Sequence, residues 1–324
     1  MNILIVTDAW KPQVNGVVTT LTNIVNILRK NNNVKVVTID NCKVKVPTPY
    51  PGVKMGFFLD HKISENVQWA DAIHIATPEG TIGTRYRREL EKRNITFTTG
   101  YHTKWPEFLK AMLHIPEDFT YPYLRKVNKH SKAVLVPTEA ARKELEEKGF
   151  KNVKTWTRGV DRSNFTFNDA PEDYIVCVSR VSKEKGLDDF CSLPYPNKVV
   201  VGDGPYLVEL KRKYTDVDFV GVKHGKELAD YYRNAKVFVF PSKADTFGVV
   251  MIEAMACGTP VAAYPVTGPV DVIDSGITGT MHENLQVAIE QAKTLDRRAV
   301  YEFSKKWDWG TSASQFKEFL VQRV

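Results

Sequence analysis

The chain has 324 residues, of which 43% are apolar and 26% charged, and its formal net charge is +7. This length exceeds one typical core and suits two domains of roughly 150 residues each. No stretch approaches the roughly 18 apolar residues that span a bilayer, which excludes a transmembrane protein. The positive charge suits anionic ligands such as nucleotide diphosphates, phospholipid headgroups or nucleic acid, and does not choose among them.

The opening MNILIVTD has only four apolar residues in a row and no basic segment before it. It is therefore typical of a first β-strand and not of a signal peptide. We expect a cytoplasmic protein, either soluble or held at the surface of a membrane. The four cysteines lie far apart without a CxxC pair, which predicts buried reduced thiols and neither a metal site nor a disulfide framework: Cys42, Cys177, Cys191 and Cys257.

Short apolar runs rich in Val and Ile alternate with segments of helical periodicity through the first half. The predicted strands are Ile3–Val6, Val34–Thr38, Ala72–Ala76, Ile95–Thr98, Ala133–Val136 and Val153–Trp156. The predicted helices between them are Val17–Arg29, Gly80–Lys92 and Ala140–Lys148. Runs that are apolar on both faces and joined by helices indicate a parallel sheet covered on both sides.

The second half repeats this alternation after a polar stretch at 165–173 (FTFNDAPED). Its predicted strands are Tyr174–Val178, Lys198–Val201, Val217–Val220, Val237–Phe240 and Pro260–Ala263, with helices near 204–214, 226–235 and 248–257. We therefore expect an α/β protein with two Rossmann-like, doubly wound domains at 1–160 and 161–305. A C-terminal segment, 306–324, carries a helical pattern at Thr311–Val321 that can pack back on the first domain. Ligands of two such sheets bind at the carboxyl ends of the strands, in a shared cleft.

The most informative segment is 241–258, PSKADTFGVVMIEAMACG, where a strand passes through a polar loop into a helix. Asp245 lies in the loop, and Glu253 lies about a turn and a half inside the helix. The free backbone N–H groups of Phe247, Gly248, Val249 and Val250 suit an anion or sugar oxygens, and a carboxylate inside the helix can accept both hydroxyls of a ribose. The alternative is an N-capping acid followed by a surface glutamate.

Two further strand ends carry polar motifs. Arg180 and Lys185 follow a strand in VSRVSKEKG (178–186), where two cations suit a diphosphate leaving group; a solvated basic loop is the alternative. Gly202 lies in VVVGDGP (199–205), a tight turn that we place near the nucleotide. The turn lacks the full GxGxxG spacing, so a dehydrogenase is not favoured.

These motifs together resemble the retaining glycosyltransferases of family 4, which have the GT-B fold of two Rossmann-like domains. The resemblance runs from residue 1 to about 320 and is carried by VPTEAARKELEEKGFKNVKTWTRGVD (136–161), VSRVSKEKG (178–186), VGDGP (201–205) and PSKADTFGVVMIEAMACGTPVAA (241–263). The first of these pieces and the DTFG within the last are most similar to the GDP-mannose-dependent α-mannosyltransferases.

The resemblance implies roles for the second-half residues. The family motif has two glutamates separated by seven residues, the first contacting the sugar and the second the ribose. Here the spacing is kept but the first acid is Asp245, so Asp245 is assigned to the sugar and Glu253 to the ribose. Arg180 and Lys185 correspond to the basic pair that holds the donor diphosphate. The second domain would thus bind the nucleotide sugar.

In the first half the resemblance implies two more site residues. The segment 12–20, PQVNGVVTT, is similar to the family's glycine loop, with Asn15 and Gly16 at the positions of two glycines. Gly16 would let the backbone approach the diphosphate; a simple strand-to-helix turn is the alternative. His102, after the predicted strand ITFTT, matches the active-site histidine and would hydrogen-bond the sugar. Alone, such a histidine is more often structural.

The implied reaction moves a hexose of the mannose or glucose type from a GDP- or UDP-linked donor to a hydroxyl, with retention of configuration. No clear DxD motif is present, so we expect no metal requirement and no cofactor besides the donor. In this family the first domain binds the acceptor, often a lipid or a glycan. The basic and aromatic stretches 81–93, 101–113 and 121–132 suit an anionic membrane surface, but a solvated helix face fits them equally.

Other classes of protein remain open. A GT-B sugar-nucleotide epimerase would convert the donor without an acceptor, and a non-catalytic module would bind a sugar nucleotide or a nucleic acid without turnover. Nucleic acid is not favoured as a partner, and we expect a monomer. The presence of His102, Arg180, Lys185 and Glu253 together favours a transferase, because binding alone rarely needs all four.

Overall fold

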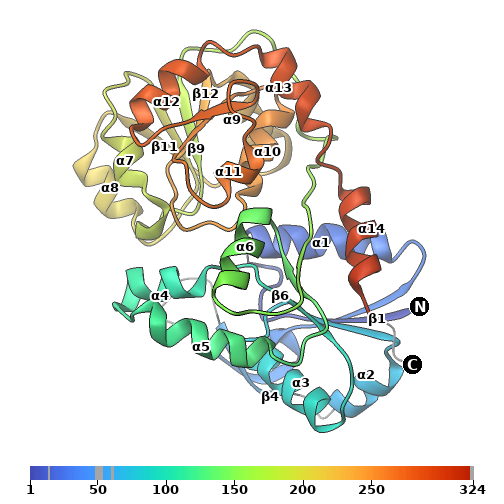
Figure 1. Ribbon diagram of the computed structural model, residues 1–324. Coiled ribbons are helices and arrows are strands. Elements are labelled where there is room, and N and C mark those ends of the chain that lie inside the picture. The colour runs from blue at the N-terminus through green and yellow to red at the C-terminus, as the bar shows by residue number, and fades with distance from the viewer. Residues whose placement is uncertain (14, 48–53, 60–61, 322–324) are drawn as a thin grey trace. The chain divides into compact units, whose positions relative to one another are not determined.

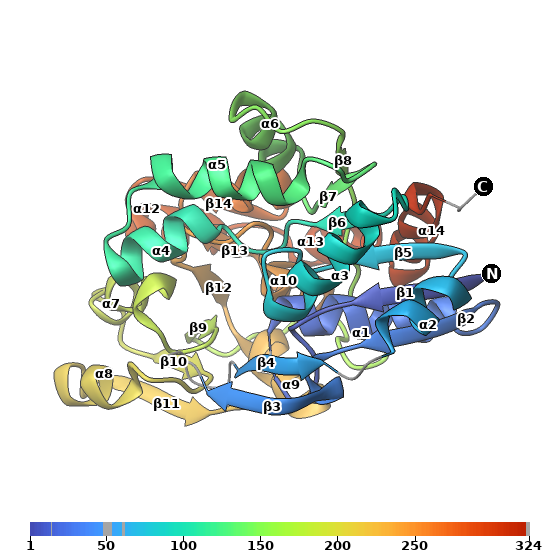
Figure 2. The same ribbon diagram turned by 90° about the horizontal axis from the view of Figure 1, so that it is seen from below.

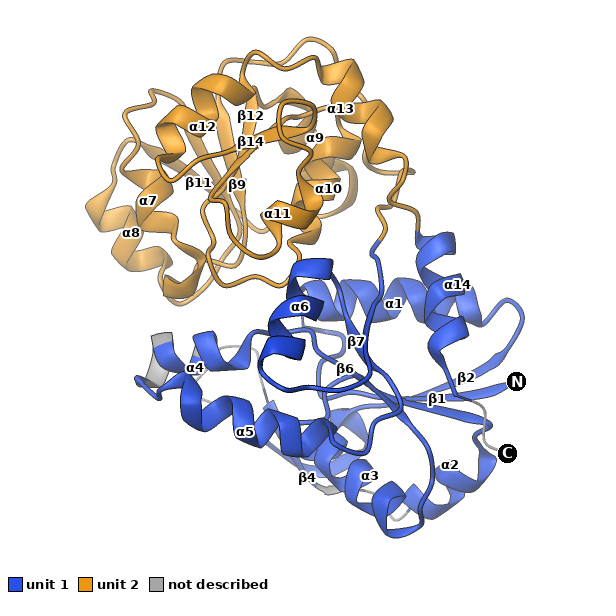
Figure 3. Ribbon diagram, viewed as in Figure 1, with its two compact units in different colours: residues 1–158, 309–324 blue, residues 159–308 orange. Residues whose placement is uncertain are grey.

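The computed structural model describes residues 1–13, 15–47, 54–59 and 62–321 (Figure 1). The chain forms two compact units, coloured separately in Figure 3. The first comprises Met1–Arg158 and Trp309–Val324, and the second Gly159–Asp308. Each unit is built on one six-stranded parallel sheet, as the alternation of strands and helices predicts.

The first sheet has the strand order β2-β1-β5-β6-β7-β8. Its strands are β1 (Asn2–Val6), β2 (Asn33–Val37), β5 (Ala72–Ile75), β6 (Thr98–Gly100), β7 (Val134–Val136) and β8 (Val153–Thr155). Its helices are α1 (Gly16–Leu28), α2 (Ile63–Trp69), α3 (Thr81–Lys92), α4 (Trp105–Leu113), α5 (Glu117–Asn128), α6 (Glu139–Glu147) and α14 (Trp309–Phe319). All of the strand pairs in this sheet are parallel.

Helices cover both faces of the first sheet. On one face α1 and the C-terminal helix α14 lie together, and Ile5, Leu21 and Phe316 share a buried core there. On the other face α2 and α3 bury Leu4 and Tyr86, and α5 and α6 extend that layer. The expectation that the C-terminal helix packs back on the first unit is confirmed.

The second sheet has the order β11-β10-β9-β12-β13-β14 and is also entirely parallel. Its strands are β9 (Ile175–Val178), β10 (Lys198–Val201), β11 (Val217–Gly221), β12 (Val237–Phe240), β13 (Val261–Ala263) and β14 (Gly279–Met281). Its helices are α7 (Leu187–Cys191), α8 (Leu207–Lys213), α9 (Gly225–Asn234), α10 (Val249–Ala256), α11 (Pro269–Val272), α12 (Leu285–Ala292) and α13 (Arg297–Ser304). Helices α9, α10 and α13 cover one face, and α7, α8 and α12 cover the other.

One predicted strand is misplaced. Strand β6 covers Thr98–Gly100, not Ile95–Thr98. Asn94 adopts a left-handed conformation (φ 53°), and the Ile95 N–H donates to the carbonyl of Leu90 over 2.9 Å. This pattern is a helix C-terminal cap in which the apolar Ile95 ends α3. The strand therefore begins three residues later in the sequence, at Thr98.

Several elements lie outside the sequence-based predictions. A two-stranded antiparallel ribbon, β3 (Cys42–Pro47) with β4 (Lys54–Leu59), forms apart from the main sheet (Figure 2). The helices α4 and α5 follow β6, and β14 extends the second sheet. All four cysteines are buried free thiols, as predicted. Among the described residues, none of the helices combines the length and the apolar character that crossing a bilayer requires.

Candidate active site

Three loops meet at the carboxyl edge of the second sheet, where they follow the neighbouring strands β10, β9 and β12. A Cβ on Gly186, in the loop after β9, would lie 2.6 Å from the carbonyl oxygen of Pro241, where the loop after β12 begins. The N–H of Val181 donates to the carbonyl of Asp203, in the loop after β10, over 2.9 Å. These close approaches bring polar side chains of separate motifs within reach of one another.

Lys185, in the loop after β9, forms an ion pair with Asp245, in the loop after β12, with 2.7 Å between Nζ and Oδ1. Their side chains are 19% and 24% exposed, so a ligand can still reach the pair. Burial on its own would raise the pKa of Asp245, but the charge and hydrogen bond of Lys185 outweigh it and lower that pKa. Asp245 does not cap α10, because the N-cap position is Gly248 and no side chain bonds there.

Arg180 is held by an acid of its own motif. Its Nη2 donates to Oε1 of Glu184 over 3.0 Å, and the Ser182 hydroxyl donates to the same oxygen over 2.6 Å. The Glu184 side chain is only 5% exposed, whereas that of Arg180 is 31% exposed. Glu184 therefore orients the guanidinium, and the charge still faces outward. The sequence shows Glu184 within VSRVSKEKG, but its role depends on the turn that folds it back.

Glu253 lies on α10 and is anchored by a tyrosine of a different helix. The hydroxyl of Tyr232, on α9, donates to Oε2 of Glu253 over 2.9 Å. Tyr232 is fully buried. Burial raises the pKa of Glu253 to about 7, although the Tyr232 hydrogen bond works against that rise. The carboxyl is therefore poised between its charged and neutral forms near neutral pH.

The start of α10 is shaped by Phe247 and Gly248. Phe247 is buried and packs edge-on against Trp307, with 5.3 Å between the ring centroids. Gly248 has φ 81°, and a Cβ there would approach the Phe240 ring to 2.9 Å. The helix consequently begins at Val249, and Val249 and Val250 in its first turn are half-buried.

Gly202 is required by packing. It has φ 143°, and a Cβ would overlap the carbonyl oxygen of Ser179 at the end of β9. Its N–H donates to the carbonyl of Gly221 over 2.9 Å. Glycine at this position therefore allows the ends of β9, β10 and β11 to pack closely. This packing role is separate from the predicted place of Gly202 near the nucleotide.

Gly16 begins α1 in the first unit, directly after the N-cap Asn15. The Asn15 Oδ1 accepts from the Val18 N–H over 3.0 Å. A Cβ on Gly16 would meet no atom of the described residues within 4 Å. Packing within the protein therefore does not demand glycine at this position, in contrast to Gly202.

His102 follows β6 at the carboxyl edge of the first sheet. Its Nδ1 lies 3.5 Å from Nη2 of Arg158, and its ring stands edge-on to Trp156 with centroids 5.9 Å apart. Burial, then Arg158, then His74 lower the pKa of His102 well below its usual range. The imidazole is therefore neutral near neutral pH. His102 and Gly16 belong to the first unit and the other predicted site residues to the second.

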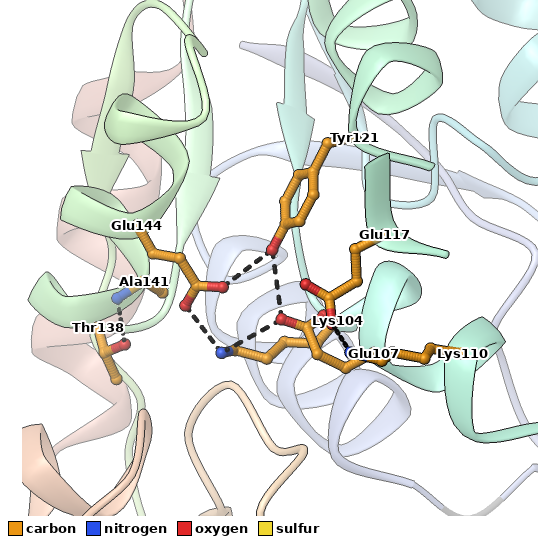
Figure 4. A network of polar contacts seen from close by, with 8 residues as sticks. All are labelled: Lys104, Glu107, Lys110, Glu117, Tyr121, Thr138, Ala141 and Glu144. Carbon is orange, nitrogen blue, oxygen red and sulfur yellow. Dashed lines mark hydrogen bonds and ion pairs between the residues drawn. The ribbon is translucent and has the colours of Figure 1, made fainter. Parts of the chain in front are cut away.

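A cluster of charged side chains around Lys104 was not anticipated from the sequence (Figure 4). Lys104 Nζ lies 2.8 Å from Glu144 and 3.7 Å from Glu107, and the hydroxyl of Tyr121 contacts both acids. Lys104 is 6% exposed. It is therefore committed to an internal network that joins α4, α5 and α6 and is not presented to an outside anion.

The basic stretch at 81–93 forms α3, but its apolar residues face the core. Ile82, Tyr86 and Leu90 are buried. Arg87 pairs with Glu91 at 2.8 Å, which neutralises part of the outer charge. These features fit a solvated helix face, and contact of this stretch with a membrane stays a prediction.

Exposed aromatic residues lie instead on α5. Phe119 is 74% exposed and Tyr123 is 50% exposed, and the spacing of four residues places them on one face of the helix. The exposed Lys126 follows in the last turn.

Metal ligands do not gather in the part of the chain that the structure describes: no group of three or more His, Cys, Asp or Glu side chains there is arranged to hold an ion. Asp188 and Asp189 lie on the short helix α7, where Asp188 accepts from Tyr206 and Lys213 and Asp189 from Tyr264.

Comparison with known proteins identifies two family models in order along the chain. "Glycosyltransferase Family 4" matches residues 14–164, and "Glycosyl transferases group 1" matches residues 172–297. The sulfoquinovosyl transferase of Arabidopsis thaliana is 28% identical over 291 residues, and the GDP-mannose-dependent α-mannosyltransferase of Corynebacterium glutamicum is 25% identical over 316. The alignments cover 76% and 87% of this chain, but 56% of the plant enzyme and 76% of the bacterial one.

The fold also matches solved structures. The Anabaena protein HepE in complex with UDP superimposes with a TM-score of 0.73 at 18% identity, covering 98% of this chain and 99% of HepE. At that identity the match establishes the shared fold of two Rossmann-like units.

Proposed function

The chain belongs to family 4 of the glycosyltransferases, enzymes that transfer a sugar from a nucleotide sugar, and we propose that it is a retaining hexosyltransferase with a lipid or glycan acceptor. The donor is a GDP- or UDP-linked hexose of the mannose or glucose type. Similarity to a GDP-mannose-dependent enzyme supports mannose, and the HepE complex was solved with UDP. The first acid of the motif is Asp245 here and a glutamate in the family. The proposal therefore includes both mannose and glucose as the donor sugar.

The observation that carries the proposal is the joint placement of Lys185, Asp245 and Glu253 at the carboxyl edge of one sheet. This edge is where doubly wound sheets bind nucleotides. Asp245 is assigned to the sugar hydroxyls, and Glu253 to the ribose hydroxyls with Tyr232 as its anchor. Lys185 is assigned to the diphosphate. Arg180 joins it, and the backbone N–H groups at the start of α10 contribute dipoles of the same sign.

In the proposed reaction the bond between the anomeric carbon and the diphosphate oxygen breaks, and a bond to the acceptor oxygen forms on the same face of the sugar. The departing phosphate takes the proton of the acceptor hydroxyl. Negative charge grows on the diphosphate as the sugar becomes oxocarbenium-like, so Arg180 and Lys185 stabilise the transition state more than the ground state. No side chain is required as a general base.

The first unit contributes two residues to donor contacts in this proposal, Gly16 and His102. The open space around Gly16 suits close approach of the diphosphate to the start of α1. His102 is neutral, so it acts as a hydrogen-bonding group toward the sugar. The division of labour, with donor binding in the second unit and acceptor binding in the first, remains a prediction from the resemblance.

For a lipid acceptor, α5 offers a surface that suits contact with a membrane. Aromatic side chains that are largely exposed, followed by a lysine, are typical of helices that lie at the headgroup level. Phe119 and Tyr123 meet this description. We propose that this face contacts an anionic bilayer when the acceptor is a lipid; a glycan acceptor would not need it.

The proposal is tested by release of nucleoside diphosphate from a panel of GDP- and UDP-sugars, with and without total lipid extract. The variants Glu253→Ala and His102→Ala are compared with matched controls on the surface, Glu290→Ala and His130→Ala. We expect release from one donor, stimulated by an acceptor, lost in the first two variants and kept in the controls. Tight donor binding without release under any acceptor would overturn it in favour of a binding module, and sugar interconversion without release would favour an epimerase.

A further inference from the structure

A buried arginine, Arg158, lies against the proposed active-site histidine at the end of the first unit. It follows β8 and is 3% exposed. Its Nη1 donates to the carbonyls of Trp156 and Thr157 over 2.6 and 3.1 Å, and its Nη2 lies 3.5 Å from His102 Nδ1. Among the described residues, no carboxylate forms an ion pair with it. A buried cation held only by neutral groups is costly, so its position calls for a function.

The Trp156 ring that packs against Arg158 is itself held by several contacts. Its guanidinium lies over the Trp156 ring, 4.3 Å from the centroid. The Trp156 indole N–H donates to both the carbonyl and the hydroxyl of Ser312 on α14, each over 3.0 Å. Phe316 of the same helix packs on that indole with centroids 4.8 Å apart. The C-terminal helix therefore fixes the tryptophan, which in turn fixes the arginine.

This geometry selects one form of the His102 ring. A guanidinium has five N–H donors and no acceptor, so the facing Nδ1 must accept. The hydrogen of the neutral imidazole is then on Nε2. The ring is accommodated by Gly100, where a Cβ would lie 2.5 Å from Nε2.

The charges around the ring act in the same direction. Arg158 and His74 are the groups whose charges act on His102, and both oppose its protonation. Burial lowers the pKa of Arg158 to about 9, so it still carries its charge at neutral pH. Burial and Arg158 lower the pKa of His74 to about 3, so at neutral pH the opposing charge comes from Arg158 and that of His74 acts only in acid.

We propose that Arg158 is a positioning residue for sugar transfer: it holds His102 as the neutral tautomer with the hydrogen on Nε2. His102 then stays a neutral group during the reaction and does not act as a general acid or base. The inference rests on the proposed role of His102, but the contact and the tautomer can be tested without turnover.

The test combines long-range proton–nitrogen NMR of histidine-labelled protein with kinetics for Arg158→Met and Arg158→Lys. His102 signals are assigned with His102→Gln, and Arg142→Met, a surface arginine of the same unit, is the matched control. In the native protein and in Arg142→Met we expect His102 to show protonated Nε2 and bare Nδ1 from pH 5.5 to 8. In Arg158→Met we expect a mixture of the two neutral tautomers and a His102 pKa that moves upward, because the N–H donor and the charge of Arg158 are lost while burial remains.

In the kinetic arm we expect kcat of Arg158→Met to fall at least tenfold, with the donor KM changing less than threefold. Arg158→Lys keeps the charge and should keep the tautomer, which separates loss of positioning from loss of folding if the methionine variant is unstable. A native His102 with the hydrogen on Nδ1, or an unchanged tautomer and titration in Arg158→Met, would overturn the inference. A confirmed tautomer together with full activity of His102→Gln would instead overturn the proposed role of His102.

Discussion

Nζ of Lys185 lies 2.7 Å from Oδ1 of Asp245, so the residue assigned to the donor diphosphate and the residue assigned to the donor sugar are bound to each other. A nucleotide sugar placed here would exchange this ion pair for contacts of lysine with phosphate and of aspartate with sugar hydroxyls. The pair keeps the lysine from pointing into solvent and orients the aspartate. The ion pair therefore holds both side chains in place for the donor, but it also competes with the donor for them.

Asp245→Asn should separate these two effects. Without the carboxylate charge, Lys185 is released, and free nucleoside diphosphate should bind about 2–5-fold tighter, the size of a partly exposed ion pair. Turnover should fall by roughly 10²-fold because a sugar contact is lost. Calorimetry and nucleotide release measure the two quantities, and Asp230→Asn on α9 is the control. Weaker diphosphate binding in Asp245→Asn would contradict the competition.

Glu253 should cost stability at alkaline pH. Its pKa in the folded protein is about 7, above the usual value, because of burial. Between the unfolded and folded pKa values the folded state binds more protons, so this group makes stability fall as the pH rises toward 7. Glu253→Gln should therefore raise the Tm by a few °C at pH 8, with the difference disappearing near pH 4, below the ordinary glutamate pKa of about 4.3. An equal gain at both pH values would point to packing and not to ionisation.

Gly16 and Gly202 should respond oppositely to alanine. A Cβ on Gly16 meets open space, so Gly16→Ala should keep or slightly raise the Tm, and it should raise the donor KM several-fold if the diphosphate approaches there. Gly202→Ala clashes with Ser179 and has an unfavourable φ, so it should destabilise the second unit by about 2–3 kcal/mol. Thermal unfolding and donor kinetics are measured together. An unchanged KM in Gly16→Ala would mean a simple turn.

The C-terminal helix should be essential to the first unit. Phe316 is fully buried against Trp156 and His74, so Phe316→Ala should cost about 3–5 kcal/mol of unfolding free energy. Phe119→Ala, at a 74% exposed position, should stay within about 0.5 kcal/mol of the native protein. Denaturant unfolding measures both. Similar values for the two variants would show that α14 is not anchored as described.

Turnover should survive EDTA. Lys185, Arg180 and the start of α10 place positive charge where the diphosphate is expected, which is the role a divalent ion would otherwise fill. Nucleotide release is compared before and after chelation, with Mg²⁺ added back as a control. A strict requirement for Mg²⁺ or Mn²⁺ would contradict the assignment of charge stabilisation to these groups.

The alternation of strands and helices predicts both sheets because parallel strands are apolar on both faces. The ribbon of β3 and β4 escapes this pattern, since its residues Val44, Val46 and Phe57 are at least 36% exposed and mixed with lysines. Ile95 is apolar but ends a helix. Local hydrophobicity cannot separate a strand from a helix cap when the same residue type serves both.

The site residues follow from motifs, but their partners do not. Lys185 meets Asp245 because Gly186 lets two loops touch, a contact between segments about 60 residues apart. Glu253 accepts a hydrogen bond from Tyr232 on another helix, and His102 contacts Arg158, which follows β8. Each partnership depends on the packing of strand ends in three dimensions. No spacing along the chain encodes it.

The most direct measurement is the configuration of the newly made glycosidic bond. Proton NMR of the anomeric region follows the reaction of an α-linked GDP- or UDP-hexose with the acceptor identified in the release assay. We predict an α-linked product from the first turnover, together with one equivalent of nucleoside diphosphate. A β-linked product, or a changed sugar that is still attached to the nucleotide, would contradict retaining transfer by this protein.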